Sequence, residues 1–107
     1  MAVIVVSGQR SVTTAGTAVA LTTGAGVMLG GVYMIKAKPG NTGVIYIGND
    51  GAGDVTSSNG LSLTADDVVI WTVTDPFELK IDATADAQGV TFARVAGQVV
   101  GIDPPGI

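Results

Sequence analysis

Residues 32–48 constrain the fold of this chain more than any other stretch. Two runs rich in β-branched and aromatic residues flank residues 38–43, a dense cluster of turn formers. Pro39 fixes its own φ and favours an extended Lys38, while the glycines of the cluster tolerate positive φ. The pattern predicts a strand, a tight connection and a second strand, and therefore an antiparallel hairpin.

The rest of the chain repeats short extended runs separated by turn residues. Tyr33, Ile35 and Ala37 alternate with polar or exposed positions and are expected on one face of a strand. Residues 77–82 alternate most cleanly, and they predict a strand with three apolar side chains inward and three charged ones toward water. The inward residues are Phe77, Leu79 and Ile81, and the outward ones are Glu78, Lys80 and Asp82. With no credible long helix, about seven to nine such strands predict an all-β, antiparallel, jelly-roll-like β-sandwich.

Residues 1–107 are expected to form a single β-sandwich domain, with an N-terminal arm at 1–9 and an extended tail at 96–107. Charged residues make up only 13% of the chain, against about 25% in typical soluble domains. We infer from this deficit that much of the surface meets other protein. Residues 2–6 are apolar throughout, so both faces of this first predicted strand should be covered.

The chain contains no cysteine and no histidine. Disulfides, thiolate chemistry, zinc sites built on these residues and histidine acid–base catalysis are therefore excluded. The threonines at 13–23 have no neighbouring base that would activate them as nucleophiles. We expect neither an enzyme nor a bound cofactor.

Charge is divided unevenly along the sequence. Arg10, Lys36 and Lys38 are the charged residues before position 50, and all nine acids follow. Three bases are too few for a nucleic-acid footprint. In one interpretation, the acidic second half of the chain simply supplies solubility. In the other, the basic and acidic halves have opposite charge and orient the subunit on a partner.

An uncharged stretch at residues 11–35 is long enough to be weighed as a membrane span. Its threonines and glycine pairs break it into short pieces at strand spacing, so no membrane association is expected. The loop at 49–54 carries Asp50 and Asp54 with oxygen donors at spacing faintly like a calcium loop. It lacks the closing glutamate, and a solvated turn is the favoured interpretation over a weak cation site. Asp66 and Asp67 are interpreted as charges that protect a sheet edge rather than as ligands joined to that loop.

Three sequence blocks, TAGTAVAL at 14–21, IKAKPGNTGVIYIG at 35–48 and SSNGL at 57–61, resemble small tailed-bacteriophage virion proteins. A late LKIDA at 79–83 and a closing GVTF at 89–92 continue the likeness, which is greatest to capsid decoration (cement or auxiliary) proteins. The resemblance spans roughly residues 9–95. It implies a homotrimeric β-sandwich that binds the major capsid protein on the outside of the virion and is made in the host cytoplasm.

As a hypothesis, the N-terminal arm and the Gly-rich loop at 22–31 contact sister subunits or the shell, with three bases facing acidic capsid groups. The proposed interface residues are Val3, Ile4, Val5, Val6, Arg10, Met28, Leu29, Lys36 and Lys38. A tail, baseplate or head-fibre component is the alternative within virion proteins. A carbohydrate-binding module is the alternative outside them, since Tyr33, Tyr46 and Trp71 could line a sugar-binding surface, although such residues are more often core or interface.

Overall fold

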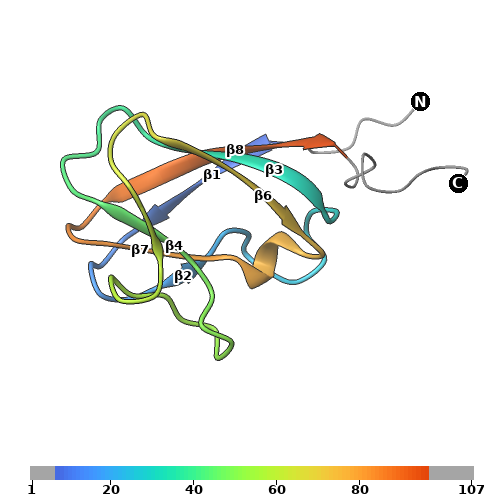
Figure 1. Ribbon diagram of the computed structural model, residues 1–107, viewed down its shortest axis with the longest axis horizontal. Helices are drawn as coiled ribbons and strands as arrows, with labels where there is room; N and C mark the ends of the chain where they lie inside the picture. Colours follow the sequence, from blue (N-terminus) through green and yellow to red (C-terminus); the bar gives the residue numbers. More distant parts are fainter. Residues whose placement is uncertain (1–6, 97–107) are drawn as a thin grey trace, which may run out of the picture.

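The computed structural model describes residues 7–96, which form two antiparallel sheets packed as a compact β-sandwich (Figure 1). The elements are β1 (Ser7–Val12), β2 (Val19–Ala20), β3 (Gly31–Ala37), β4 (Ile45–Gly48), β5 (Leu61–Leu63), β6 (Val68–Val73), the 3-10 helix η1 (Pro76–Glu78), β7 (Lys80–Ala83) and β8 (Gln88–Ala96). The predicted fold class is confirmed.

The two sheets have the strand orders β1-β8-β3-β6 and β2-β7-β4-β5. The hydrogen-bonded pairs are nested, because β1 pairs with β8, β2 with β7, β3 with β6 and β4 with β5. The chain is thus one long antiparallel ribbon folded over so that successive pairs alternate between the sheets. Such nesting of eight strands defines a jelly roll.

The hairpin predicted for residues 32–48 is wrong. Strand β3 lies in the first sheet between β8 and β6, whereas β4 lies in the second sheet between β7 and β5. The connection at 38–44 therefore crosses from one sheet to the other. Its proline and glycines do specify a chain reversal, but the partner of each strand is decided by residues far away in the sequence.

Hydrogen bonds to the start of β8 hold this crossing connection in place. The Oε1 atom of Gln88 accepts hydrogen bonds from the backbone N–H groups of Thr42 at 2.6 Å and Gly43 at 3.0 Å. Asn41 and Gly89 exchange two further bonds, from Asn41 Nδ2 to the Gly89 carbonyl and from Gly89 N–H to Asn41 Oδ1. The loop is therefore ordered by long-range contacts rather than by its own turn geometry alone.

Replacing Gln88 with alanine should destabilise the domain by about 1–3 kcal/mol, because two partly buried N–H groups lose their acceptor. Gln88→Glu keeps an acceptor for both groups and should cost clearly less. Urea denaturation of the two variants and the parent protein measures the difference. Equal unfolding midpoints for all three proteins would show that the loop does not depend on this side chain.

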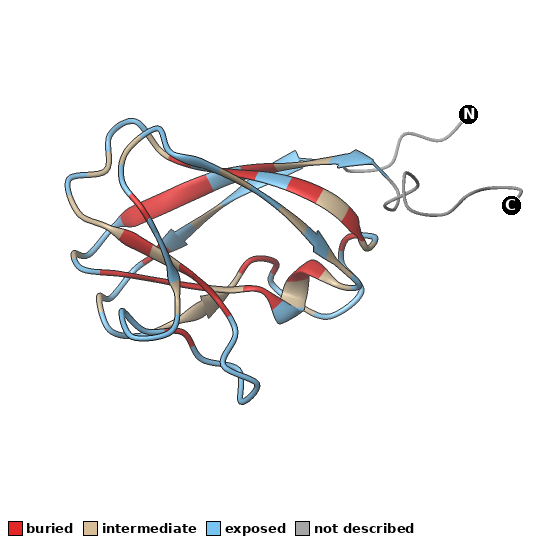
Figure 2. Ribbon diagram, viewed as in Figure 1, coloured by how far each residue is buried: buried red, intermediate tan, exposed pale blue. Residues whose placement is uncertain are grey.

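The core lies between the two sheets (Figure 2). Tyr33, Ile35 and Ala37 of β3 share one face, as expected, and the structure shows that all three are fully buried. They meet Ile45 and Ile47 of β4 from the opposite sheet in one cluster of buried residues. In β8, Val90 and Phe92 also point inward, and Phe92 packs beside Tyr33 with ring centroids 6.3 Å apart.

Residues 77–82 differ from the predicted continuous strand. Pro76–Glu78 form η1, capped by Asp75, whose side chain accepts a hydrogen bond from the Phe77 N–H. Leu79 and Ile81 are buried as expected, but Asp82 is buried too rather than turned to water. Its carboxylate accepts hydrogen bonds from the N–H of Gly16 at 2.9 Å and from that of Ala83 at 2.7 Å. The acid is tolerated because it ties the turn after β1 to β7.

Candidate interaction surface

The outer face of the β1-β8-β3-β6 sheet carries a strip of exposed apolar side chains. Met34 lies opposite Ile70 in the β3–β6 register, and Lys36 lies opposite Val68. The exposed fractions are 41% for Met34, 61% for Ile70 and 49% for Val68. Inner and outer residues alternate along a strand, so the burial of Tyr33 and Ile35 places their neighbour Met34 on the outer face. Val68 and Ile70 lie on the same face of the neighbouring strand. They form the outer apolar strip, a name used below for Met34, Val68 and Ile70.

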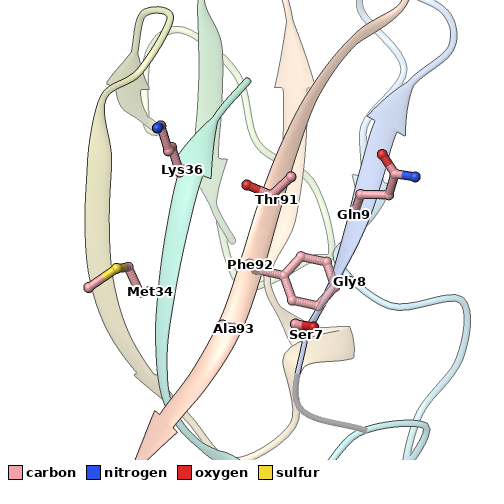
Figure 3. A pocket seen from close by; sticks show the side chains of 8 residues that line it. All are labelled: Ser7, Gly8, Gln9, Met34, Lys36, Thr91, Phe92 and Ala93. Carbon is pink, nitrogen blue, oxygen red and sulfur yellow. The ribbon is translucent and has the colours of Figure 1, made fainter. Parts of the chain in front are cut away.

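A shallow open depression of about 580 Å³ lies beside the strip (Figure 3). Its floor is β8, where Thr91 and Ala93 are small enough to leave the sheet surface low. Met34 and Lys36 of β3 line one side, and Gln9 of β1 lines the other, as the side chains in Figure 3 show. The lining residues are Ser7, Gly8, Gln9, Met34, Lys36, Thr91, Phe92 and Ala93. A depression this open and this poor in charge suits a protruding protein side chain better than an enclosed small molecule.

Two lysines border the depression at the same end of the sheet. The Lys36 ammonium lies 3.4 Å from the Asp66 carboxylate, with both side chains substantially exposed. The Lys38 ammonium donates a hydrogen bond of 2.5 Å to Gln9 Oε1 across β8. The exposed Lys36–Asp66 ion pair contributes little to stability, so its exchange for a contact with a partner would cost the fold little.

Asp67 directly precedes β6 and follows Asp66 of this ion pair. Its carboxylate accepts hydrogen bonds from the backbone N–H and the hydroxyl of Thr64, and these bonds lower the pKa of Asp67 below its ordinary value. Asp67 therefore stays charged at a lower pH than an ordinary aspartate does. The start of β6 therefore carries a negative charge, and β6 contains no basic residue that would compensate it.

The residues proposed for the interface are dispersed. Lys36 and Lys38 do lie together on the outer face. Arg10 points the other way, into the space between the sheets, where its Nε donates to the Ala20 carbonyl at 2.8 Å. Met28 is buried in the core at 7% exposure, so its side chain is not presented to a partner, whereas its neighbour Leu29 is 50% exposed. Val3, Ile4, Val5 and Val6 lie outside the described residues.

Val68 and Ile70 were missed by the sequence reasoning. The signal was available, because VVIWTV at 68–73 contains no polar residue except one threonine. An apolar run with both faces apolar indicates that both faces should be covered. The pattern of residues 68–73 therefore predicts a covered outer face, as that of residues 2–6 does.

The aromatic residues proposed for sugar binding do not share a surface. Tyr33 is fully buried, Trp71 packs against the core, and Tyr46 is half-buried on β4 of the other sheet. In the loop at 49–54, Asn49 and Asp50 use their side-chain oxygens to accept backbone N–H groups of the loop itself. Within residues 7–96 no group of three or more acidic residues is arranged to hold a metal ion.

Across the part of the chain that the structure describes, no helix is long and apolar enough to cross a membrane. No protein-family model, curated protein or solved structure matches the chain. The outer apolar strip with its depression is thus the surface on which a functional proposal has to be based.

Proposed function

We propose that the protein is a structural virion subunit of a tailed bacteriophage, which binds the outside of the capsid as an oligomeric decoration protein and stabilises the shell. The observation that carries the proposal is the outer apolar strip, Met34, Val68 and Ile70, exposed on a sheet whose opposite face is already used for the core. Contiguous exposed apolar surface marks sites of association. The resemblance of the three sequence blocks supplies the kind of particle.

The arrangement suits adhesion rather than chemistry. The strip and the depression lie on strands of a packed sandwich, so they are held rigidly and lose little entropy on binding. Two lysines at one end offer charges to acidic groups of a shell, which fixes orientation more than affinity. Contacts of modest strength, repeated by symmetry around a capsid, add up through effective concentration.

Co-sedimentation with empty tailed-phage capsids that lack a decoration protein tests the proposal. The protein should saturate the capsids at a fixed ratio and raise the temperature at which they break. Met34→Glu should weaken binding about tenfold or more, because a carboxylate would be buried against apolar surface on binding. Leu61→Glu is the matched control, since Leu61 is similarly exposed, at 49%, but belongs to the other sheet.

Failure of the protein to bind any capsid, combined with binding to a glycan array, would overturn the proposal in favour of a carbohydrate-binding role. Equal weakening by Met34→Glu and Leu61→Glu would show that the outer apolar strip is not the contact surface.

A further inference from the structure

Among the residues that the structure describes, no further strand covers either edge of the β1-β8-β3-β6 sheet. Within residues 7–96, β1 pairs with β8 alone and β6 pairs with β3 alone. An open edge presents a row of backbone N–H and C=O groups that can pair with another strand. The two edges of this sheet therefore offer two strand-binding sites on opposite sides of the molecule.

The direction in which each backbone group points follows from bonds at the end of β3. Ala37 donates to the Asp67 carbonyl and accepts from the Asp66 N–H, so Ala37 faces β6. Lys38 donates to the Gly89 carbonyl, so it faces β8. Antiparallel pairing alternates these directions residue by residue.

Applied across the sheet, this alternation directs the backbone groups of Val68, Ile70 and Thr72 away from β3, toward the open edge of β6. On β1 it directs the groups of Ser7, Gln9 and Ser11 away from β8. All six residues carry exposed side chains. On each edge, every second residue therefore directs its backbone groups away from the sheet and its side chain to the outer face.

Strand β6 lacks the features that protect natural edges. It is six residues long, VVIWTV, with no charge, no proline and no register shift in its pairing with β3. Valine, isoleucine, tryptophan and threonine are also the residues that favour strands most. Such an edge is expected to associate unless a partner strand covers it.

The charges beside the two edges are of opposite sign. Lys38 reaches across β8 to bond Gln9 of β1, and Arg10 also belongs to β1, although its side chain is directed between the sheets. Asp66 and Asp67 precede β6, and Asp75 follows it. Pairing β6 with another β6 would bring acids at the ends of both strands together, which is unfavourable. Pairing β6 with β1 brings bases toward acids.

We propose that β6 of one copy pairs antiparallel with β1 of the next, so that the sheet continues head to tail between sister subunits. The strand directions fit, because β1, β8, β3 and β6 alternate in direction and a following β1 continues the alternation. One register pairs the backbone groups that point away from the two sheet edges. It sets Ser7 opposite Thr72, Gln9 opposite Ile70 and Ser11 opposite Val68. A head-to-tail contact of this kind generates a closed ring when the rotation from copy to copy closes, and an open filament when it does not; the ring suits the discrete oligomer of the proposed function. The proposal deepens the proposed function and rests on the self-association assumed there.

Cysteine cross-linking tests the contact cleanly because the chain has no cysteine of its own. Residues directly opposite in a hydrogen-bonded antiparallel pair have Cα atoms about 5.5 Å apart, within the range that a disulfide spans. Mild oxidation of the double variant Gln9→Cys with Ile70→Cys should therefore link copies into covalent oligomers that end at the ring size. The matched control is Ser11→Cys with Thr72→Cys, whose cysteines lie at opposite ends of the contact and should link at least about tenfold more slowly.

The single variants separate head-to-tail pairing from two-fold pairing. Ile70→Cys alone should remain monomeric under denaturing, non-reducing conditions. Efficient disulfide dimers of this single variant would overturn the proposal in favour of β6 pairing with itself. Absence of cross-links in the double variant, with the parent protein a monomer by native mass spectrometry, would equally overturn it and indicate that the edges are covered within one chain.

A proline variant gives a second test that is independent of disulfide chemistry. Ile70→Pro removes an N–H group that faces away from β3, so the fold should tolerate it, as edge strands tolerate proline. The oligomer should dissociate with a Kd raised about tenfold or more, whereas Ile70→Thr, which keeps the N–H group, should stay associated. An unchanged oligomer in Ile70→Pro at wild-type stability would overturn the proposal.

Capsid co-sedimentation of the same variants distinguishes this inference from the proposed function. Capsid binding without head-to-tail cross-links would reject the edge contact and leave the decoration role standing. Cross-linked rings that bind no capsid would support the edge contact and reject the decoration role.

Discussion

Replacing Gly30 with alanine is expected to destabilise the domain strongly. A Cβ atom at this position would lie 2.2 Å from the Thr74 carbonyl oxygen, 2.7 Å from its carbonyl carbon and 2.9 Å from the Val73 oxygen. All three are backbone atoms, so no side-chain rotation can relieve the overlap. The Gly30 carbonyl is itself held by Arg94 Nε at 3.0 Å, which limits movement of the loop away from β6. We expect a loss of at least about 3 kcal/mol, at the upper end of the cost of overpacking.

Gly40→Ala is the matched control, because nothing lies within 4 Å of its added Cβ and its φ is outside the left-handed region. This variant should match the parent protein or gain up to about 1 kcal/mol by restricting the unfolded chain. Urea denaturation, or the soluble fraction after expression where Gly30→Ala does not fold, gives the comparison. Similar unfolding midpoints for the two variants would contradict the close approach of the loop at residues 22–30 to the end of β6.

The fold class could be predicted because its signal is local. The alternation predicts that Tyr33, Ile35 and Ala37 share one face of a strand; the structure confirms the shared face and shows that it is core. The pairing of strands could not be read in the same way. Turn residues at 38–43 indicate where the chain reverses, but the long-range bonds of Gln88 and Asn41 decide that the reversal crosses between sheets. The nested pairs join segments as distant as β1 and β8.

The candidate surface was predicted in part. The alternation predicts that Lys36 lies on the opposite face of the strand from Ile35; the structure confirms this and shows that the face of Lys36 is the outer one. Met28 was assigned to an exposed loop because glycines surround it in the sequence. The loop instead folds over the core, since Gly26 N–H is held by Asp75 and the Gly30 carbonyl by Arg94. Contacts between distant segments, rather than local composition, determine which side chains of that loop are buried.

Replacing Tyr33 with alanine should cost about 3–5 kcal/mol, the range for removing a large aromatic side chain from a core. Tyr33 is fully buried in the central strand β3, faces Trp71 in the β6 register and packs beside Phe92. Since small domains are stable by only about 5–15 kcal/mol, this variant should be close to unfolded at 37 °C. Met34→Ala, the next residue on the outer face, is the control and should change stability by about 0.5 kcal/mol or less. Equal losses in the two variants would contradict the assignment of inner and outer faces.

Tyr33→Phe isolates the hydroxyl group of the same side chain. The Tyr33 hydroxyl donates a hydrogen bond of 2.5 Å to the Leu29 carbonyl, and its loss should cost about 1–3 kcal/mol at pH 7.

Burial raises the pKa of Tyr33 above its ordinary value of 10.0, Asp75 also raises it and Arg94 opposes the rise. Since the folded state holds the proton more tightly than the unfolded chain, this contribution is complete below pH 10 and is lost as the pH rises through the folded-state pKa. The parent protein should therefore lose stability above pH 10 more steeply than Tyr33→Phe, and the gap between their urea midpoints should narrow. If the difference between the two urea midpoints stays constant from neutral to strongly alkaline pH, the Tyr33 hydroxyl is not shielded from water. That result would contradict the packing of the start of β3 against Phe92 and the 22–30 loop.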